Sequence, residues 1–392
     1  MRQNAFRLYG HVAWPSPVTV RRGPVPASCA LLVMSLWVFL SAASTHAEPA
    51  KMDCVRVSED KTGFVLAPSG RRFTPWGFNY DHDEQGRLLE DYWVAEWPKV
   101  VEDFGEMKQL GANVVRIHLQ LGKFMQDRER ANRTALDQLG RLVGLAERLG
   151  LYLDVTGLGC YHKKDVPDWY DRLTEAERWD VQARFWEAIA NRCAASPAVF
   201  CYDLMNEPVV PGGRKRREDW LGPAFAGKHF VQFISLDAAG RPRPTIAKRW
   251  ICHLSAAIRK HDRRHLITVG LVPWSLDRPG LSSGFVPGRI VGDLDFVSVH
   301  LYPEKSKLEE ALKTLDGFAV GKPVVIEETF PLKCPMPELE RFLRASRKVA
   351  VGWIGFYWGK TPDEYRGSGK LADALTLGWL EFFEREGKRM GR

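Results

Sequence analysis

Short apolar runs alternate along most of the chain with longer segments in which apolar residues recur every three or four positions. The short runs predict buried strands, and the longer pattern predicts amphipathic helices. Strands are expected at residues 73–80, 113–119, 151–156, 198–206, 265–271, 296–302, 324–328 and 352–358. Helices are expected at residues 97–110, 136–149, 175–195, 249–262 and 371–385. Gly111 and Gly150 follow two of these helices directly, where glycine commonly ends a helix.

This alternation predicts an α/β protein with a parallel sheet covered by helices. Eight strand–helix units fit a single (β/α)8 TIM barrel, which we expect to occupy residues 48–392. Residues 48–72 would form a lead-in or a hairpin at the bottom of the barrel. A long insertion at residues 209–247, with a small strand at residues 230–236, follows the fourth strand. Because loops that follow barrel strands lie on the catalytic face, we expect the insertion to shape substrate binding.

Two of the predicted strands end in carboxylates. Asn206-Glu207-Pro208 closes the fourth strand, and we expect Pro208 to stop further ladder pairing there. Glu327 and Glu328 close the seventh strand. A carboxylate at the end of a buried strand is costly unless it is paired or used, although a helix N-cap or a loop salt bridge would also explain one. Two such carboxylates at one barrel mouth match the requirements of glycoside hydrolysis.

Other polar and aromatic residues also fall where predicted strands end. They are Asn79, Arg116, His300 and Trp358. In a barrel these positions converge on one face, so the side chains would surround the two carboxylates. A salt bridge inside the barrel would equally explain the arginine, and a core histidine would explain the histidine.

The chain resembles the family 5 glycoside hydrolases, which are retaining enzymes that include cellulases and mannanases. The resemblance covers about residues 70–385 and rests on Asn206-Glu207-Pro208, His300-Leu301-Tyr302 and the glutamate that closes the seventh strand. It implies that Glu207 is the acid/base and Glu328 the nucleophile of a double displacement. The other implied roles are Asn206 at the sugar 2-hydroxyl, Arg116 and Tyr302 at the nucleophile, His300 in the subsite wall and Trp358 as the stacking platform.

The chain departs from the family pattern in two places. Thr156 ends the predicted third strand where many members have a histidine, and Thr329 and Phe330 follow the nucleophile where an aromatic residue and a glycine are usual. A separate question concerns the paired glutamates, because side chains alternate along a strand and both cannot face inward. The resemblance selects Glu328, so Glu327 would face the surrounding helices or a neighbouring loop.

The leading function is hydrolysis of β-glycosidic bonds in a glycan or glycoside. A transglycosylase of the same chemistry and an inactive carbohydrate-binding barrel are the alternatives. The sugar is left open. Candidate residues for stacking on sugar rings are Trp93, Trp97, Trp169, Trp220 and Trp274. Core packing would equally explain the first four. Trp274 is the exception, because it directly follows the fifth strand. We therefore expect Asn79 and Trp274 to bind substrate alongside the residues implied by the resemblance.

No cofactor and no metal are expected, because no cysteine or histidine spacing of a metal site occurs. The basic run at residues 214–217 lies in a glycine- and proline-flanked loop, and no nucleic-acid motif accompanies it. We therefore expect a carbohydrate partner and no nucleic acid.

The first 47 residues differ from the remainder, because they contain no Asp or Glu and place Arg21 and Arg22 before an apolar run at residues 30–43. This pattern predicts a signal peptide at residues 1–47 and a secreted or periplasmic protein, with an uncleaved anchor as the alternative. The run is shorter than the roughly 20 residues of a membrane span, so no stable span is expected after cleavage. Removal of four arginines would lower the formal net charge from +8 to +4.

Overall fold

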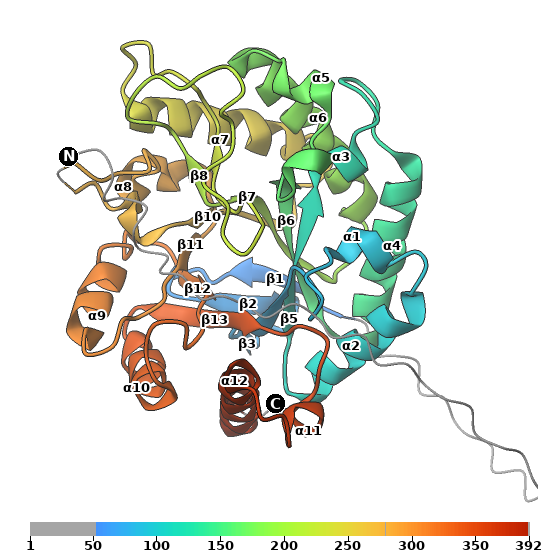
Figure 1. Cartoon of the computed structure of the whole chain (residues 1–392), viewed down its shortest axis with the longest axis vertical. Coiled ribbons are helices and arrows are strands. Elements are labelled where there is room, and N and C mark those ends of the chain that lie inside the picture. Colours follow the sequence, from blue (N-terminus) through green and yellow to red (C-terminus); the bar gives the residue numbers. More distant parts are fainter. Residues whose placement is uncertain (1–51, 279, 391–392) are drawn as a thin grey trace, which may run out of the picture. The chain divides into compact units, whose positions relative to one another are not determined.

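The computed structural model describes residues 52–278 and 280–390. Its centre is a closed barrel of eight parallel strands, so the predicted TIM barrel is confirmed (Figure 1). In chain order the strands are β4 (Trp76–Tyr80), β5 (Val114–Gln120), β6 (Tyr152–Gly159), β7 (Val199–Asn206), β10 (Leu266–Leu271), β11 (Val297–His300), β12 (Val324–Glu328) and β13 (Ala350–Phe356). The predicted signal peptide at residues 1–47 lies outside the described residues.

Helices follow the strands and surround the barrel (Figure 1). The longer ones are α2 (Trp97–Gln109), α4 (Arg133–Leu149), α6 (Glu175–Cys193), α7 (Arg243–Arg259), α9 (Leu308–Asp316), α10 (Met336–Ser346) and α12 (Leu371–Arg389). Short helices occur in the loops: α1 (Leu89–Tyr92), α3 (Leu121–Phe124), α5 (Asp168–Asp171), α8 (Pro287–Ile290) and α11 (Pro362–Tyr365). Among the described residues, no helix has the length and apolar character needed to cross a bilayer.

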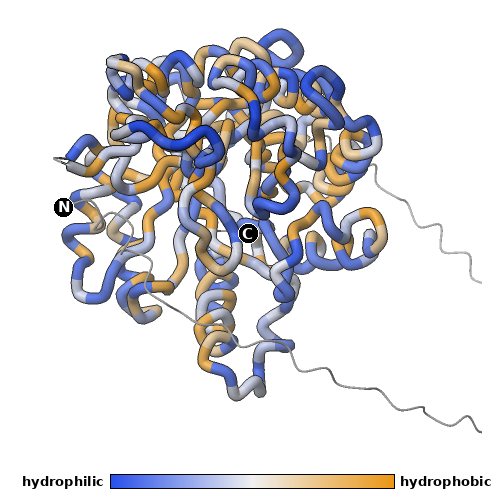
Figure 2. Tube along the Cα trace, turned by 45° about the horizontal axis from the view of Figure 1, so that its top comes forward, coloured by the Kyte–Doolittle hydropathy of each residue, from blue (hydrophilic) through white to orange (hydrophobic). Residues whose placement is uncertain are grey.

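Local sequence signals account for the helix ends. The Asn132 side chain accepts from backbone N–H groups in the first turn of α4, and Gly150 ends this helix in the left-handed conformation (φ 63°). Thr174 and Glu177 form a capping box at the start of α6. Apolar positions concentrate along the strands and the inward helix faces, while the outer turns and loops are mostly hydrophilic (Figure 2).

A small antiparallel sheet covers the amino-terminal end of the barrel. It consists of β1 (Cys54–Val57), β2 (Phe64–Ala67) and β3 (Arg72–Phe73). Phe64 packs edge-on against Phe200 and Phe296 at ring-centroid distances of 5.2 and 5.3 Å. These apolar contacts close the amino-terminal end of the barrel. Polar side chains can therefore gather at the carboxyl-terminal end of the strands.

The insertion after β7 contains a short strand, β9 (Gln232–Phe233), that pairs in parallel with β8 (Pro208–Val209). The expectation that Pro208 stops ladder pairing is therefore wrong. The pairing uses the carbonyl groups of Glu207 and Val209 as acceptors, so the missing N–H of proline is not needed. Helix α7 begins at Arg243, earlier than expected, which shortens the insertion.

Candidate active site

The two strand-end carboxylates meet at the mouth of the barrel. Glu207 directly follows β7, and Glu328 is the last residue of β12. A carboxylate oxygen of each lies within 4.8 Å of the other and of a ring nitrogen of His300. Both residues are almost completely buried. Retaining glycosidases place their two carboxyl groups about 5 Å apart, so this spacing suits direct attack by one carboxylate and protonation by the other.

The backbone at Glu207 adopts a left-handed conformation with a φ of 47°. A residue with a β-carbon rarely takes this conformation, which costs about 1–3 kcal/mol. The Glu207 N–H donates to the carbonyl of Gly270 (3.1 Å), and its own carbonyl accepts from Gln232. Neighbouring strands therefore hold the strained residue and direct its side chain toward Glu328.

Arg116 on β5 is the central cation of the site and is completely buried. Its Nη1 donates to Glu328 Oε1 at 2.7 Å. Its Nη2 donates to Asp203 Oδ2 at 2.7 Å and to Asn206 Oδ1 at 3.0 Å. Burial opposes the charge, but Glu327, Asp203 and Glu328 raise the arginine pKa well above its usual value. A permanent positive charge therefore fixes the Glu328 carboxylate.

His300 on β11 links the two carboxylates. Its Nδ1 donates to Glu207 Oε1 at 3.0 Å and lies 3.5 Å from Glu328 Oε2, and its Nε2 lies 3.4 Å from Glu327 Oε2. Burial alone would lower the pKa of His300, but the charge of Glu328 and hydrogen bonds to Glu207 and Glu327 raise it to about 10. The imidazole is therefore a cation at neutral pH.

Gly270 on β10 makes room for this histidine. A β-carbon at this position would lie 2.9 Å from His300 Nε2 and 3.2 Å from Arg116 Nη2. Both distances are shorter than ordinary contacts, so the close approach of the two cations to β10 requires glycine here.

Tyr302 and Trp358 follow the sixth and eighth strands of the barrel, β11 and β13. The Tyr302 hydroxyl donates to Glu328 Oε2 at 2.7 Å, so both carboxylate oxygens have a donor. The Trp358 ring follows β13, packs edge-on against Phe330 and stacks with His82 at a centroid distance of 5.9 Å. Phe356 also stacks with this indole at a centroid distance of 5.4 Å, and contact of Trp358 with sugar stays a prediction.

The model of the cellulase family, glycosyl hydrolase family 5, matches residues 78–331. This chain belongs to glycosyl hydrolase family 5. It is a glycoside hydrolase, as the strand-end carboxylates predict.

The relatives of this family 5 hydrolase include mannan-degrading enzymes. A mannan endo-1,4-β-mannosidase A from Emericella nidulans is 24% identical over 310 residues, which cover 69% of this chain and 71% of that protein. An exo-β-1,4-mannosidase structure from an Opitutaceae bacterium has a TM-score of 0.63 at 16% identity. The match covers 85% of this chain and 62% of the mannosidase chain. An endo-1,4-β-mannanase structure from Rhizomucor miehei has a TM-score of 0.57 at 18% identity, covering 85% and 99% of the two chains. The structural likenesses support the barrel fold.

The structure overturns the prediction that Glu327 faces the helices or a loop. In the family 5 hydrolase its carboxylate is completely buried in the barrel, where it accepts from Ser298 Oγ at 2.8 Å and lies 3.5 Å from Arg116 Nη2. The register between β11 and β12 shifts at this point, so that Ile326 pairs with Val299 but Glu328 pairs with His300. This irregularity interrupts the alternation, and both glutamates of β12 therefore reach the interior.

Two predicted substrate-binding residues have structural partners. Asn79 is completely buried; its Nδ2 donates to the carbonyls of Glu327 and Gly355, and its Oδ1 accepts from Arg116. Trp274 packs against the apolar cluster of Val209, Val231 and Phe233 in the insertion. Asn79 therefore positions Arg116, and Trp274 packs against the insertion. Direct contact of Asn79 or Trp274 with sugar stays a prediction.

Sequence reasoning missed a second pair of polar residues in the hydrolase. His118 lies two positions after Arg116 on β5, and Tyr161 follows β6. Burial and Arg116 lower the histidine pKa, so the neutral ring accepts the Tyr161 hydroxyl at Nδ1 (2.5 Å) and donates from Nε2 to Asn79 Oδ1 (3.3 Å). The period of two from Arg116 could have identified His118.

The third strand also extends further than predicted, to Gly159 rather than residue 156. Thr156 is therefore inside the barrel, where its hydroxyl donates to Asp203 Oδ2 at 2.8 Å. The residues that follow this strand at the mouth begin at Cys160, so Thr156 does not occupy the strand-end position where many members have a histidine.

Two groups of described residues in the hydrolase have the spacing of metal ligands. One is Glu207, His300 and Glu328, and the other is Asp154, Asp203 and Glu327. In the first group His300 itself supplies the positive charge between the carboxylates. In the second, Arg116 contacts Asp203 and Glu327. Burial, together with the negative Glu327, raises the pKa of Asp154, which favours its neutral form. Cations and protons of the protein therefore balance both groups.

The charge on His300 predicts a pH-dependent contribution to stability. Its pKa rises from about 6.5 in the unfolded chain to about 10 in the fold, so the stabilisation is complete below pH 6.5 and is lost toward pH 10. The free energy by which His300→Gln destabilises the fold should therefore shrink by up to about 1.4 kcal/mol per pH unit in this range. Urea unfolding of both proteins at pH 6 and pH 9 measures this change.

The exposed His253, whose Nε2 lies 3.3 Å from Asp180, provides the control. His253→Gln should give nearly equal unfolding free energies relative to the native protein at the two pH values, because exposed ion pairs contribute little. An equal destabilisation by His300→Gln at both pH values would contradict a charged His300.

Proposed function

We propose that this family 5 hydrolase cleaves β-mannosidic bonds with retention of configuration at the anomeric carbon. Glu328 is the nucleophile, and Glu207 is the acid/base. The observation that carries the proposal is the pairing of the two carboxylates within 4.8 Å, with different partners around each. Glu328 accepts hydrogen bonds from Arg116 and Tyr302, while Glu207 is bonded only to His300 among the described side chains.

The reaction proceeds in two displacements. Glu207 donates its proton to the glycosidic oxygen while Glu328 Oε2 or Oε1 attacks the anomeric carbon, so the leaving sugar departs as an alcohol. Glu207, now a carboxylate, removes a proton from water that attacks the glycosyl ester, and Glu328 leaves as the carboxylate. Arg116 and Tyr302 stabilise the Glu328 charge that returns in the second step. Asn206, whose Oδ1 accepts from Arg116, would hold the sugar 2-hydroxyl.

The activities given in the names of the relatives support mannosides as the substrate. The curated relatives from Emericella nidulans, Podospora anserina and Arabidopsis thaliana are all mannan endo-1,4-β-mannosidases. Structures of similar fold include exo- and endo-acting β-1,4-mannan enzymes. The shared bond in these names is the β-1,4-mannosidic bond.

Hydrolysis of a panel of aryl β-mannosides, β-glucosides and β-galactosides tests the proposal. We expect the highest kcat/KM on the mannoside, and proton NMR of the first product should show the β-anomer before mutarotation. An initial α-anomer would exclude the double displacement. A preference for glucosides would retain the mechanism and exclude the proposed sugar, and transfer to added alcohols exceeding hydrolysis would indicate a transglycosylase.

We also propose that the hydrolase is exported and that residues 1–47 are removed. The proposal is supported by the acid-free, apolar sequence of this segment. Amino-terminal sequencing of protein recovered outside the cytoplasm should begin at Glu48. A mature protein that begins at Met1 and stays with the membrane would support the uncleaved anchor instead.

A further inference from the structure

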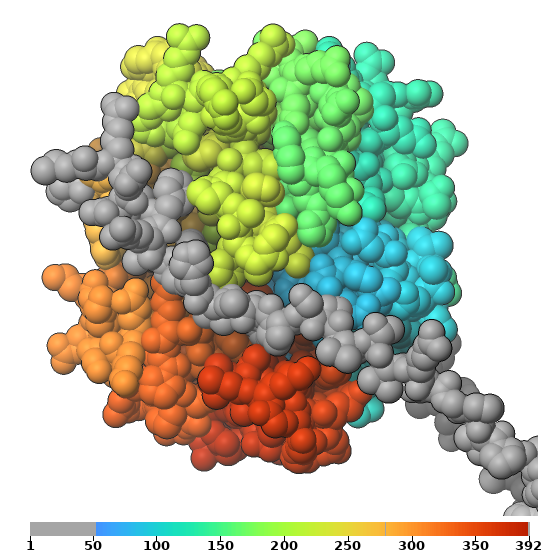
Figure 3. Space-filling model, in the orientation of Figure 1, coloured from blue at the N-terminus to red at the C-terminus, as the bar shows by residue number. Residues whose placement is uncertain are grey.

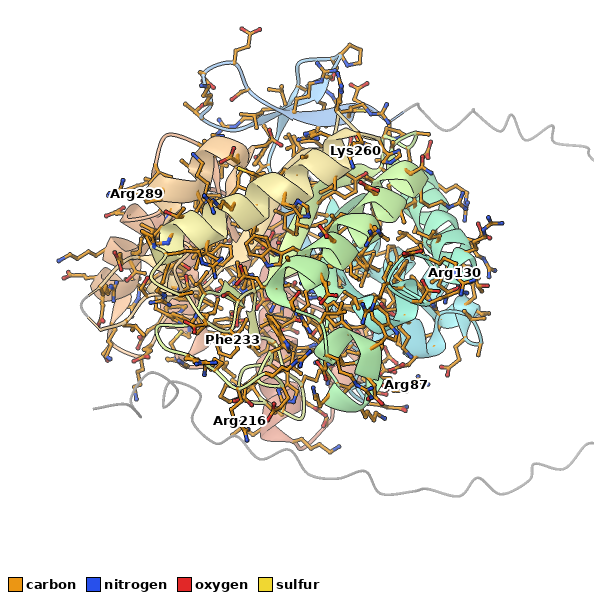
Figure 4. All side chains as sticks on the ribbon, turned by 90° about the horizontal axis from the view of Figure 1, so that it is seen from above. Arg87, Arg130, Arg216, Phe233, Lys260 and Arg289 are labelled. Atoms are coloured by element: carbon orange, nitrogen blue, oxygen red, sulfur yellow. The ribbon has the colours of Figure 1, made fainter. Side chains whose placement is uncertain are left out.

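The insertion after β7 reaches the loop that follows β4, where Gly86 lies close to Lys228. Phe225 and Lys228 exchange backbone hydrogen bonds of 2.8 and 2.9 Å, and the two residues between them both have positive φ angles, which makes a tight hairpin turn. Figure 3 shows the yellow-green surface of the insertion bordering the blue and cyan surface of the segment after β4. Figure 4 shows Arg216 and Phe233 of the insertion at the same end of the molecule as Arg87.

The hairpin is fixed to two strand ends. The His229 N–H donates to the carbonyl of Tyr161 after β6 at 2.8 Å, and Asn206 Nδ2 at the end of β7 donates to the carbonyl of Phe230 at 3.1 Å. The Phe230 ring also packs edge-on against Tyr161 at 5.0 Å. The position of the hairpin is therefore determined by residues of the active site.

Lys228 at this turn is a buried lysine. It is 5% exposed, and its Nζ forms no hydrogen bond or ion pair with the residues that the structure describes. Asp81 and Asp83 attract it across a gap, and Gly86 lies so close that a β-carbon there would be 3.3 Å from Nζ. A buried ammonium group without a hydrogen-bond acceptor is costly, so a ligand that supplies an acceptor would be favoured.

Asp81 provides the complementary group. It directly follows β4 and is 3% exposed, and its Oδ1 has no hydrogen-bond partner in residues 52–278 and 280–390. Asp83 differs, because Arg87 and two backbone N–H groups already bond its carboxylate. The residue next to Asp81, His82, stacks on Trp358 with an angle of 10° between the rings. The free carboxylate oxygen therefore belongs to the loop that lies against the predicted sugar platform.

The order of the strands gives the direction of the substrate. Glu207 protonates the leaving oxygen, so the leaving group lies on the β7 side. With Trp358 after β13 as the predicted sugar platform, the ring that Glu328 attacks would lie on the side of β13, and β4 is the next strand of the barrel. The end of that ring remote from the cleaved bond would therefore point toward Asp81 after β4 and toward Lys228, which Asp81 attracts.

We propose that Asp81 and Lys228 together bind the hydroxyl groups of a terminal, non-reducing sugar, so that the enzyme removes single sugars from chain ends. A carboxylate oxygen accepts and an ammonium group donates, and a sugar hydroxyl can satisfy both. The hairpin approaches the loop after β4 at Gly86, where a β-carbon would lie 3.3 Å from Lys228 Nζ, and this approach would close the remote end of the sugar site. The inference rests on the proposed glycosidase function and adds the mode of action to it.

The test compares Lys228→Met with the native enzyme on p-nitrophenyl β-mannoside and on the corresponding β-mannobioside, or on the matching pair for the sugar the enzyme prefers. The native enzyme should release only the monosaccharide from the bioside in its first turnovers. Lys228→Met should raise KM for the monoside about 10- to 100-fold, the effect of a lost hydrogen bond to a charged group, with a smaller change in kcat. Asp81→Asn should shift KM in the same direction.

Lys215→Met is the matched control, because Lys215 lies in the same insertion with its Nζ 4.5 Å from the Phe233 ring centre. It should leave KM and the products unchanged, and Lys228→Arg should recover part of the lost affinity. If the native enzyme first releases the disaccharide, or if Lys228→Met binds the monoside normally, the inference is wrong while the glycosidase function stands. If the native enzyme hydrolyses no aryl glycoside, the proposed function fails and the inference with it.

Discussion

Replacing Glu328 with alanine should lower kcat on aryl β-glycosides by roughly a million-fold, the scale of loss when an essential nucleophile is removed. Added azide should restore part of the rate. The removed carboxylate leaves a space bordered by Arg116, Tyr302 and His300, whose donors and positive charge suit a small anion. Azide attacking from this side inverts the anomeric carbon, so the product should be the α-glycosyl azide, which NMR identifies.

Glu327→Gln is the control for this experiment. Glu327 is completely buried and accepts from Ser298 Oγ at 2.8 Å. The substitution should reduce the rate by disturbing Arg116 and His300, because the charge of Glu327 stabilises both cations. Azide should rescue nothing in this variant. Rescue of Glu327→Gln, or its absence in Glu328→Ala, would contradict the assignment of the nucleophile.

The barrel was predictable because its strands are nearly uniform in burial. Every residue of β5, β6 and β7 is buried, as expected for strands covered on both faces. Such strands appear in the sequence as short apolar runs, and closure of the barrel then brings their ends together. The convergence of Glu207, Glu328 and Arg116 therefore follows from local patterns and the fold rule alone.

The inward position of Glu327 was not predictable from the strand itself. The prediction assumed a regular ladder, in which alternate side chains face opposite sides. The shift that breaks this alternation lies in the pairing of β12 with β11, two segments separated in sequence by a helix. Its partners, Ser298 and Arg116, come from other strands, so no pattern within residues 324–328 indicates it.

The insertion shows the same limit. A small strand was expected at residues 230–236, and β9 occupies only Gln232 and Phe233. Its length depends on the short partner strand after Glu207, not on its own apolar residues. The tight turn before Lys228 includes Ala226 in a left-handed conformation, which is unusual for alanine and gives no clear signal in the sequence. The approach of Lys228 to Gly86 in the loop after β4 joins segments far apart in the sequence, so no local pattern indicates it.

The last prediction concerns Glu207 and depends on the leaving group. Glu207→Ala should lower the glycosylation rate about 10²- to 10⁴-fold on substrates with alkyl or sugar leaving groups, the usual contribution of a general acid. Dinitrophenyl glycosides should lose far less in this step, because their phenolate leaves without a proton. Stopped-flow measurement of phenol release separates this step from hydrolysis of the glycosyl enzyme, which should be slow for want of a base. Azide should accelerate that second step and give the β-glycosyl azide, opposite in configuration to the product of Glu328→Ala.

The matched control is Glu177→Ala on the outer helix α6. The Glu177 carboxylate caps its own helix, so this substitution should leave the rates on both substrate classes unchanged. Equal losses on good and poor leaving groups, or an α-azide from Glu207→Ala, would show that Glu207 is not the acid/base.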